Sequence, residues 1–453
     1  MKSVQNDMTV GNPMKMILSF TFPIFLGNVF QQFYNMADAV IVGKFVGTKA
    51  LAAVGSTGTI MFLIYGFVTG MTAGFTVLTA QKFGAGDMKA MRQTVGGAAV
   101  LTTIVTIILT TLGLLFMKPL LIFMKTPSDI FKDAYAYIMI ICAGITAQML
   151  YNLMASILRA LGNSKVPLYF LILSALLNIA LDLLLIIVFG LGASGAAYAT
   201  VIAQGISGLL CLVYVKLKVP LLHLERDDWR PKGHLLKMQF AVGVPMALQY
   251  SITAIGTMMV QTSQNLLGSI IVAAFTAASK IEQVVTQAYV ALGTTMATYC
   301  AQNIGAGKIK RIRKGFKSAT IMASIYAVVT AALIMTVGKY MTYLFVSDNV
   351  IEIMSNVDIY LKCIGVFFIP LAIVNLYRNG IQGMGYGLLP MMAGVAELIG
   401  RGVVAVIAAN KRSYFGVCMA SPAAWVLAGG LLLVMYYYIM LKDMKRKFPN
   451  RIE

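Results

Sequence analysis

The sequence has little charge and almost no histidine. Only 11% of its 453 residues are charged and two are histidines, whereas soluble domains carry roughly 25% charged residues. Between the charged residues run apolar stretches of about 20 residues or more, which is long enough to cross a bilayer. The scarcity of charge therefore excludes an ordinary soluble protein and predicts an integral membrane protein made of helices. A β-barrel would instead show short strands of alternating polarity.

Cysteine is also scarce and shows no metal-binding or redox spacing. The five cysteines lie in or beside apolar runs and form no CxxC pair, which argues against a disulfide framework or a zinc site. His223 and His234 share one charged loop and lack ligand spacing. Since no His, Cys or Ser constellation has catalytic spacing, we predict that the protein is not an enzyme and needs no organic cofactor.

The apolar runs give twelve candidate membrane spans, and the polar start of the chain predicts no cleavable signal peptide. The longest polar connection, 217–237, divides the spans into two sets of six. We therefore predict an N-terminal lobe over 1–216, a linker loop over 217–237 and a C-terminal lobe over 238–453. The predicted spans are 15–42, 51–79, 94–117, 131–158, 167–189, 195–216, 238–264, 271–300, 318–337, 352–378, 389–410 and 417–441.

The net charge of +20 follows the positive-inside rule, which we favour over nucleic-acid binding. With the N-terminus in the cytoplasm, the cytoplasmic segments hold 25 Lys and Arg residues and the outer segments hold 8. Because Lys and Arg collect in cytoplasmic loops, we predict a multi-pass protein of the cell (inner) membrane with both termini in the cytoplasm.

The chain contains a duplicated loop. Residues 80–98 read AQKFGAGDMKAMRQTVGGA and residues 301–319 read AQNIGAGKIKRIRKGFKSA, at an offset of 221. Six predicted spans separate the copies, so both copies have the same orientation in the membrane. The two lobes should therefore be related by a pseudo-two-fold axis along the membrane normal, as in secondary transporters with parallel repeats. Both loops lack GxxxxGK[ST] and are not nucleotide sites.

A polar stripe marks the first predicted span. Gln31, Tyr34, Asn35 and Asp38 recur at helical spacing, which places their side chains on one helix face. A central aspartate costs roughly 2.5–3.5 kcal/mol in a membrane helix, so the stripe should face a cavity. We expect Asp38 to bind a cation or proton and the other three residues to contact substrate.

A second polar pair interrupts the apolar run of the fifth span. Asn178 and Asp182 lie four residues apart and so project from one face. At ~1.5 Å per residue, Asp38, Asp182 and Thr200 lie ~6, ~10 and ~8 Å from the outer ends of their helices. Two carboxylates, an amide oxygen and a hydroxyl suit a hard cation such as Na⁺, and a proton could serve equally. The alternative is that Asn178 and Asp182 only join helices by hydrogen bonds.

The remaining polar residues within the spans have less definite roles. Glu397 and Arg401 lie four residues apart and are expected to neutralise each other, whereas Glu282 either attracts a cationic substrate or pairs with Lys280. Arg378, like Arg159, is expected to complement the dipole at a helix end. The further residues expected to line the cavity or contact substrate are Tyr151, Asn152, Gln249, Glu282 and Gln283.

Together these features resemble the multidrug and toxic compound extrusion (MATE) family over essentially the whole chain. The resemblance rests on the twelve spans in two halves, the AQxxGAG loops, the segment PIFLGNVFQQFYNMADAVIVGKFVG, LRALGNSKVP and NxxxD. It implies outward antiport of organic cations against Na⁺ or H⁺ by rocking of two lobes around a central cavity. One branch of the family has a cation site in the N-terminal lobe, whose residues are matched here by Asp38, Asn178, Asp182 and Thr200. Another branch couples through acids in the C-lobe, on its first and fourth helices, and this chain departs from that pattern. The seventh span has no acid, and in the tenth Asn375 lies in the corresponding region and Asp358 lies near the helix start.

The sequence therefore predicts a secondary active antiporter for multidrug efflux, or xenobiotic transport, by alternating access. We expect small cationic substrates, contact with membrane lipid, no nucleic acid and a functional monomer. The alternative is a flippase for a lipid-linked oligosaccharide or other amphipathic lipid, which should show more cationic residues along its cavity. A channel is a weaker alternative, because repeated lobes favour alternating access. The physiological substrate and the choice between Na⁺ and H⁺ stay open.

Overall fold

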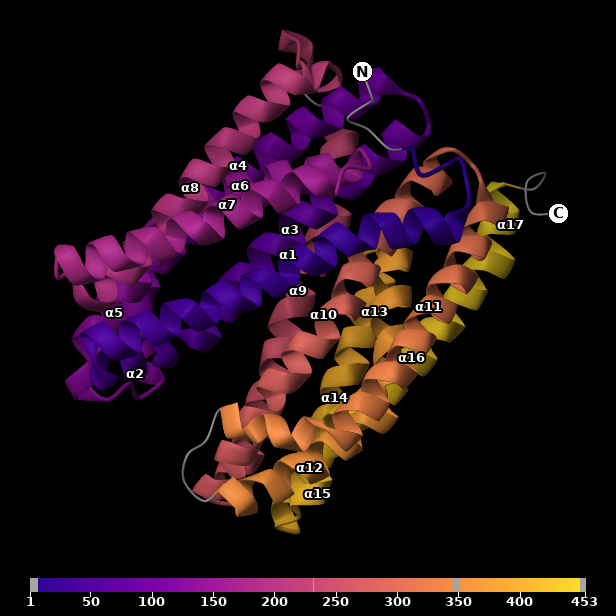
Figure 1. Cartoon of the computed structure of the whole chain (residues 1–453). Coiled ribbons are helices and arrows are strands. Elements are labelled where there is room, and N and C mark those ends of the chain that lie inside the picture. The colour runs from indigo at the N-terminus through magenta and orange to yellow at the C-terminus, as the bar shows by residue number, and fades with distance from the viewer. Residues whose placement is uncertain (1–6, 231, 345–349, 449–453) are drawn as a thin grey trace. The chain divides into compact units, whose positions relative to one another are not determined.

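Long apolar helices make up almost all of the residues that the structure describes, 7–230, 232–344 and 350–448, and no strand lies among them (Figure 1). In this computed structural model, 9 helices within those ranges are long and apolar enough to cross a membrane, or up to 11 spans if each of two bent helix pairs counts as one. The remaining predicted span is α10 (Ser269–Gly305), whose polar residues around Glu282 lower its hydropathy. The predicted all-helical class is confirmed.

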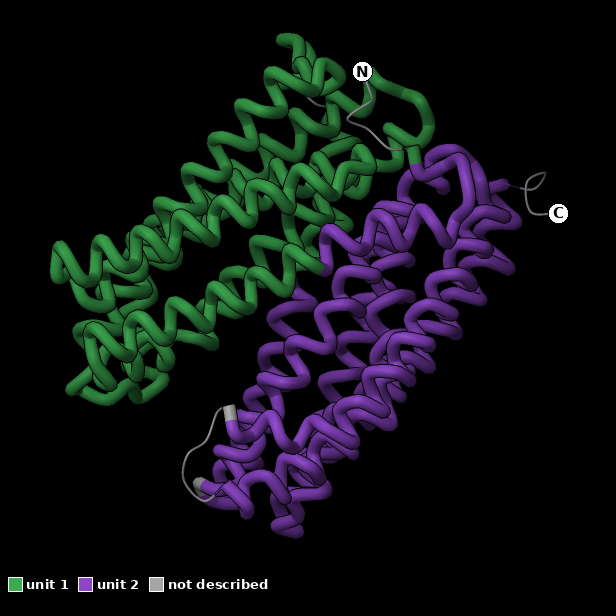
Figure 2. The backbone as a smooth tube through the Cα atoms, viewed as in Figure 1, with its two compact units in different colours: residues 1–7, 26–247 green, residues 8–25, 248–453 purple. Residues whose placement is uncertain are grey.

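The first compact unit contains residues 1–7 and 26–247 (Figure 2). In it α6 and α7 both pack against α8, and α3 packs against α4 and α6. A glycine contact brings α3 close to the start of α9, because a Cβ on Gly74 would overlap Gly243 Cα. The helices that lie wholly in this unit are α2 (Thr48–Ser56), α3 (Gly58–Gly84), α4 (Met88–Phe123), α5 (Ser128–Ala143), α6 (Ile145–Ala160), α7 (Lys165–Asp182) and α8 (Gly192–Lys218).

The second compact unit contains residues 8–25 and 248–453. Here α10 packs against α11, α12 and α13, and α16 packs against α13 and α14. Its core is rich in aromatic rings, including Phe316, Tyr377 and Tyr436 in mutual contact. Besides α10, its helices are α11 (Ile309–Thr336), α12 (Val350–Val366), α13 (Phe368–Gly383), α14 (Leu388–Asn410), α15 (Tyr414–Cys418), α16 (Ala420–Tyr438) and α17 (Met444–Lys447).

Two helices are divided between the units. The helix α1 (Pro13–Ile41) belongs to the second unit up to Phe25 and to the first from Leu26, whereas α9 (Gly233–Asn265) belongs to the first unit up to Ala247 and to the second from Leu248. These two helices open the two sequence repeats, so the repeats exchange the beginnings of their first helices. The lobe boundaries predicted from loop composition stay a prediction.

The duplicated loops fasten these exchanged segments by different contacts. In the second unit Arg311 donates to the carbonyls of Gly11 at 2.6 Å and Val10 at 2.7 Å, and Lys308 donates to that of Thr9 at 2.8 Å. In the first unit Arg92 pairs with Asp228 at 3.1 Å. Each loop thus holds the chain that leads into the first helix of the other repeat.

Several predicted spans are broken rather than continuous. The span 51–79 is interrupted at Thr57, and the spans 131–158 and 352–378 bend by 47° and 52° where α5 meets α6 and α12 meets α13. Pro370 lies in the first turn of α13 and has no N–H to continue the helical bonds from α12. At the other bend Gly144 packs on Val201, and a Cβ there would overlap that side chain.

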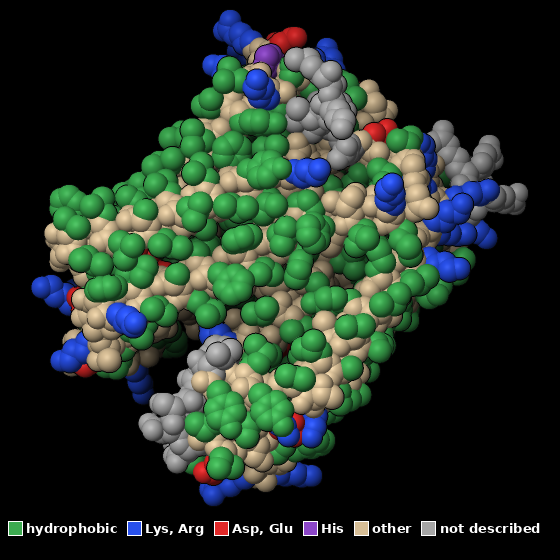
Figure 3. Space-filling model, viewed as in Figure 1, with side chains coloured by type: hydrophobic (Ala, Val, Ile, Leu, Met, Phe, Trp, Pro, Cys, Tyr) green, Lys and Arg blue, Asp and Glu red, His purple; other side chains and the backbone are tan. Residues whose placement is uncertain are grey.

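The surface of each unit matches the composition of a membrane protein. Apolar side chains cover the sides of the helices, and Lys and Arg gather toward helix ends (Figure 3). The helices α4 and α11 are the least buried of the spanning helices, each with 22% of its apolar window buried. Exposed residues such as Ile107, Leu115 and Ile325 therefore form the faces that we expect to contact lipid.

Candidate functional site

The predicted cation-site residues of the first unit lie together. Asn178 and Asp182, on the same face of α7, are 2% and 0% exposed. The amide of Asn178 donates to the Thr200 hydroxyl on α8 at 3.4 Å, and the half-buried carboxyl of Asp38 on α1 is close enough to interact directly with that of Asp182. The helix α1 and the consecutive helices α7 and α8 thus bring their polar groups to one place inside the bundle.

Several oxygens of this cluster have no hydrogen-bond partner in the described part of the chain. Asp38 Oδ1, Asn178 Oδ1 and both carboxylate oxygens of Asp182 are buried and unpaired among the described residues. A buried, unpaired oxygen costs about 1–3 kcal/mol, and more when the group is charged. A cation or a proton would satisfy them, and carboxylate, amide and hydroxyl oxygens are the ligands that hard cations prefer. The cluster therefore fits the predicted Na⁺ or H⁺ site.

Polar and aromatic residues that sequence analysis missed surround the two acids. Tyr65 and Tyr137 lie within electrostatic range of Asp38, and Gln204 contacts the predicted site residue Tyr34. Gln204 follows Thr200 by one helical turn, so its spacing could have identified it. The spacing of the two tyrosines in the sequence gave no comparable signal.

The backbone is irregular next to both acids. The π-helical turn η1 (Val42–Val46) begins one turn after Asp38, and η2 (Leu183–Val188) begins directly after Asp182. In such a turn the backbone bonds reach one residue further, as from Gly47 N–H to the Val42 carbonyl at 3.1 Å. Single π turns are rare and often occur at functional sites.

The other predicted contact residues of the first unit have varied surroundings. Gln31 is half-buried and Asn35 is exposed on α1. Tyr151 donates to the Pro167 carbonyl at 3.1 Å, and Asn152 donates to a carbonyl of its own helix. Their contact with substrate stays a prediction.

In the second unit, Glu282 does not pair with Lys280. Its carboxylate instead accepts a hydrogen bond of 2.5 Å from the Tyr360 hydroxyl on α12, while Lys280 is exposed. Gln249 on α9 accepts a bond of 2.8 Å from Gln382 on α13, and Gln283 is exposed. These residues belong to a different unit from Asp38 and Asp182.

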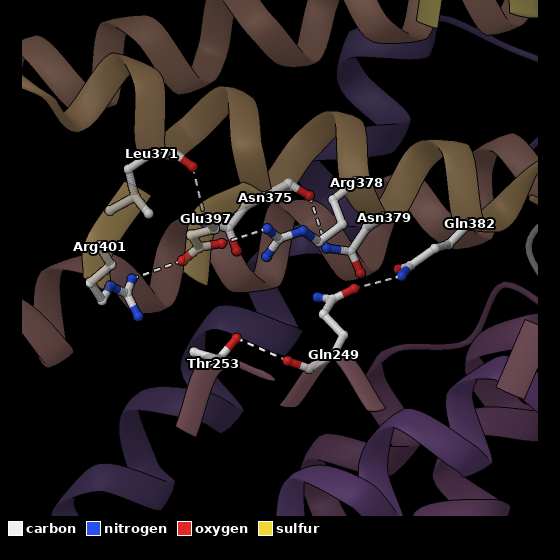
Figure 4. Close-up of polar contacts among 9 residues, drawn as sticks. All are labelled: Gln249, Thr253, Leu371, Asn375, Arg378, Asn379, Gln382, Glu397 and Arg401. Atoms are coloured by element: carbon white, nitrogen blue, oxygen red, sulfur yellow. Dashed lines mark hydrogen bonds and ion pairs between the residues drawn. The ribbon is translucent and has the colours of Figure 1, made fainter. Parts of the chain in front are cut away.

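A buried ionic cluster lies near Gln249 (Figure 4). Glu397 accepts from Arg378 at 2.6 Å and from Arg401 at 2.8 Å, and all three side chains are less than a tenth exposed. The predicted neutralisation of Glu397 by Arg401 is confirmed. Arg378 was predicted to complement the dipole at the end of its helix, and sequence analysis did not predict that its buried guanidinium binds a carboxylate on α14.

The acids of the described ranges do not form a conventional transition-metal centre. No group of three or more His, Cys, Asp or Glu side chains within 7–230, 232–344 and 350–448 is arranged to hold a metal ion. The first-unit cluster has two acids and relies on amide and hydroxyl oxygens for its remaining ligands. That donor set favours a monovalent cation or a proton over a transition metal.

Comparisons with known proteins agree with this architecture. The chain matches the family model MatE over residues 23–184 and 241–407, one segment in each half. It is 34% identical over 390 residues to the probable multidrug resistance protein YpnP of Bacillus subtilis, covering 85% of this chain and 86% of that protein. The probable multidrug resistance protein YoeA of the same organism is 27% identical over 92% of each chain.

A solved structure has the same fold. It is an outward-facing conformation of a multidrug resistance MATE family transporter of the MOP superfamily, with a TM-score of 0.91 and 22% identity over 98% of this chain and 99% of that chain. The predicted architecture of twelve helices in two lobes is thereby confirmed.

Proposed function

Since the chain belongs to the MatE family of membrane transporters, we propose that it is a secondary antiporter that exports organic cations or drugs in exchange for Na⁺ or H⁺. Its relatives YpnP and YoeA are named as probable multidrug resistance proteins, which supports drugs as the substrate class. The transporter assignment agrees with the prediction that the protein is not an enzyme.

One observation carries the coupling part of the proposal. Asp38 and Asp182 lie together in the first unit, and three of their four carboxylate oxygens are buried without a hydrogen-bond partner among the residues that the structure describes. Two adjacent carboxylates repel each other unless a cation or proton lies between them. Binding of the ion at Asp38, Asn178, Asp182 and Thr200 would favour one arrangement of the lobes, and substrate binding would favour the other.

The energetic requirement is modest. A membrane potential of 100 mV supplies about 2.3 kcal/mol per charge moved, which corresponds to roughly 50-fold accumulation. Exchange of one monovalent organic cation for one Na⁺ or H⁺ moves no net charge, so the concentration gradient of the coupling ion supplies the driving force for that exchange, and the potential contributes only when more charge enters than leaves. We also propose that both termini lie in the cytoplasm and that one chain suffices for transport.

The test is transport of a fluorescent organic cation in proteoliposomes. A Na⁺ gradient is imposed at equal pH on both sides, and a pH gradient is imposed separately without Na⁺, each at a clamped membrane potential. We expect one of the two gradients to drive uptake, and Asp38→Asn and Asp182→Asn to abolish that dependence.

A matched control is available in the same unit. Asp133 is exposed, so Asp133→Asn removes a carboxylate without touching the cluster and should transport normally. If Asp38→Asn and Asp182→Asn kept the full response to the driving ion, the coupling site would be wrong. If the wild type moved no cation under either gradient, the antiport itself would be wrong.

The flippase alternative gains no support from the buried cations. Arg378 and Arg401 are both engaged by Glu397, so they do not form an unpaired cationic surface for a pyrophosphate. A fluorescent lipid-linked sugar added to the same proteoliposomes tests this alternative directly.

A further inference from the structure

A pocket lies in the first unit, away from the acidic cluster. Its volume is about 450 Å³, within the range of roughly 300–1,000 Å³ that is typical of small-molecule sites. It is bounded by the start of α4, the end of α6, the end of α8 and the loop that follows α8. The lining residues are Val95, Ala99, Met154, Ile157, Leu212, Val215, Lys216, Leu217, Leu222, His223, Leu224 and Trp229.

The pocket wall is apolar and continues onto the outer face of α8. Only Lys216 and His223 among the lining residues are ionisable, and none is acidic. Leu212 and Leu217 line the pocket and are also 40% and 70% exposed. Because exposed apolar faces of a membrane helix contact acyl chains, the pocket opens where a lipid tail can enter from the bilayer.

The rim of the pocket is basic and carries an interfacial aromatic residue. Lys216 lines the pocket, and Lys218 lies outside the lining, two residues further along the end of α8. Both are exposed, and neither forms an ion pair among the described residues. Trp229 lines the pocket and is 53% exposed, and tryptophan favours the level of the lipid headgroups. The exposed acids Glu225 and Asp227 also lie in the loop but do not line the pocket.

The loop that closes the pocket is fastened to the helices. Asp228 binds Arg92 at 3.1 Å and accepts from the N–H of Glu225 at 3.0 Å, while His223 Nε2 lies 2.7 Å from the Lys216 carbonyl. Gly96 makes room for the loop, because a Cβ there would overlap the Asp228 carbonyl oxygen. The pocket is therefore formed in advance rather than opened by a ligand.

From these observations we propose that the pocket binds an anionic phospholipid of the membrane, with an acyl chain between α4, α6 and α8 and its headgroup phosphate at Lys216, while Lys218 at the end of the same helix adds positive charge nearby. Basic pockets at the ends of membrane helices are suited to anionic headgroups, and the apolar wall takes the chain. A neutral lipid would leave the two lysines without a counter-ion, so the headgroup charge decides which lipid binds. The site lies apart from the coupling acids and does not depend on their role.

The two tryptophans of the chain make a direct test. Trp425 is buried in the core of the second unit, so Trp425→Phe leaves Trp229 as the one reporter. The protein is reconstituted in phosphatidylcholine that contains a rising fraction of phosphatidylglycerol with brominated acyl chains, which quench tryptophan on contact. Brominated phosphatidylcholine is titrated in parallel. If Trp425→Phe expresses poorly, the difference between wild type and Trp229→Phe gives the same signal.

We expect brominated phosphatidylglycerol to half-quench Trp229 at a mole fraction several-fold lower than brominated phosphatidylcholine. The double variant Lys216→Gln/Lys218→Gln should remove that difference, and Ala99→Phe, which fills the pocket, should remove the preference as well. The matched control is Lys314→Gln/Lys317→Gln, because these exposed lysines lie on α11 of the second unit and should leave the preference unchanged.

Two results would overturn the proposal. Equal half-quenching by the two lipids in wild type would mean that Trp229 only samples bulk lipid. A preference that persisted in both Lys216→Gln/Lys218→Gln and Ala99→Phe would place the anionic lipid elsewhere. Native mass spectrometry supplies an independent readout, since wild type should retain one phosphatidylglycerol that the double lysine variant loses.

Discussion

Arg378 on α13 and Glu397 on α14 form a buried ion pair, with Nη2 and Oε2 2.6 Å apart. The same carboxylate also binds Arg401 at 2.8 Å, so one acid holds two guanidinium groups inside the second unit. Removal of one partner of a buried pair costs about 3–5 kcal/mol, because an uncompensated charge stays buried. The cluster therefore controls the stability of this unit.

The first prediction is that Glu397→Gln strongly destabilises the protein. The change leaves two buried arginines without an anion, and the thermal midpoint in detergent should fall clearly. Asp358→Asn is the control, since its pair with Lys362 at 2.6 Å is half exposed on the lysine side and is worth about 0–1 kcal/mol. Equal shifts in the two variants would contradict the prediction.

The second prediction concerns the hydroxyl of Thr200. Thr200→Val keeps the shape of the side chain but removes an oxygen from the proposed ion site, so the concentration of driving ion for half-maximal transport should rise about tenfold, equivalent to ~1.4 kcal/mol. Thr200→Ser keeps a hydroxyl and should restore the wild-type concentration for half-maximal transport. The measurement is the initial rate of cation uptake against ion concentration, and an unchanged midpoint in Thr200→Val would exclude the hydroxyl as a ligand.

The third prediction compares two glycines. A Cβ on Gly74 would overlap Gly243 Cα, so Gly74→Ala should force the helices apart at a cost of about 1–3 kcal/mol. A Cβ on Gly430 of α16 would meet no heavy atom within 4 Å, so Gly430→Ala should stabilise its helix by about 0.5–1 kcal/mol. Thermal unfolding of the two variants should therefore shift in opposite directions.

The fourth prediction concerns the hydrogen bonds that join Arg311 to the N-terminal segment. Arg311 donates to the carbonyls of Val10 and Gly11, so Arg311→Ala should increase hydrogen exchange in residues 8–16 several-fold. Lys310 is the neighbouring exposed cation, and Lys310→Ala should leave this exchange unchanged. Equal hydrogen exchange of residues 8–16 in the two variants would show that apolar packing alone holds this segment in place.

The features that sequence predicted best are those with a local signature. Hydropathy located the spans, and helical spacing joined Asn178 with Asp182 and Glu397 with Arg401, because residues four apart share a helix face. The ion pair of Arg378 with Glu397 was not predicted because the two residues lie on different helices, where no spacing rule applies. Tyr65 and Tyr137 were missed for the same reason, since their proximity to Asp38 depends on how the helices pack. Pro370 indicates the break in the span 352–378. Because hydropathy is uniform across that range, hydropathy alone predicted one continuous helix.

The division of α1 and α9 between the two units also constrains biosynthesis. The first unit includes residues up to 247, so it cannot finish packing when the ribosome has completed only the first six spans. The second unit includes residues 8–25, which are synthesised well before the rest of that unit. These residues therefore lack their packing partners until the later helices have been made. A nascent chain that stalled midway would therefore expose two unfinished bundles, and neither half of the gene should yield a stable product by itself.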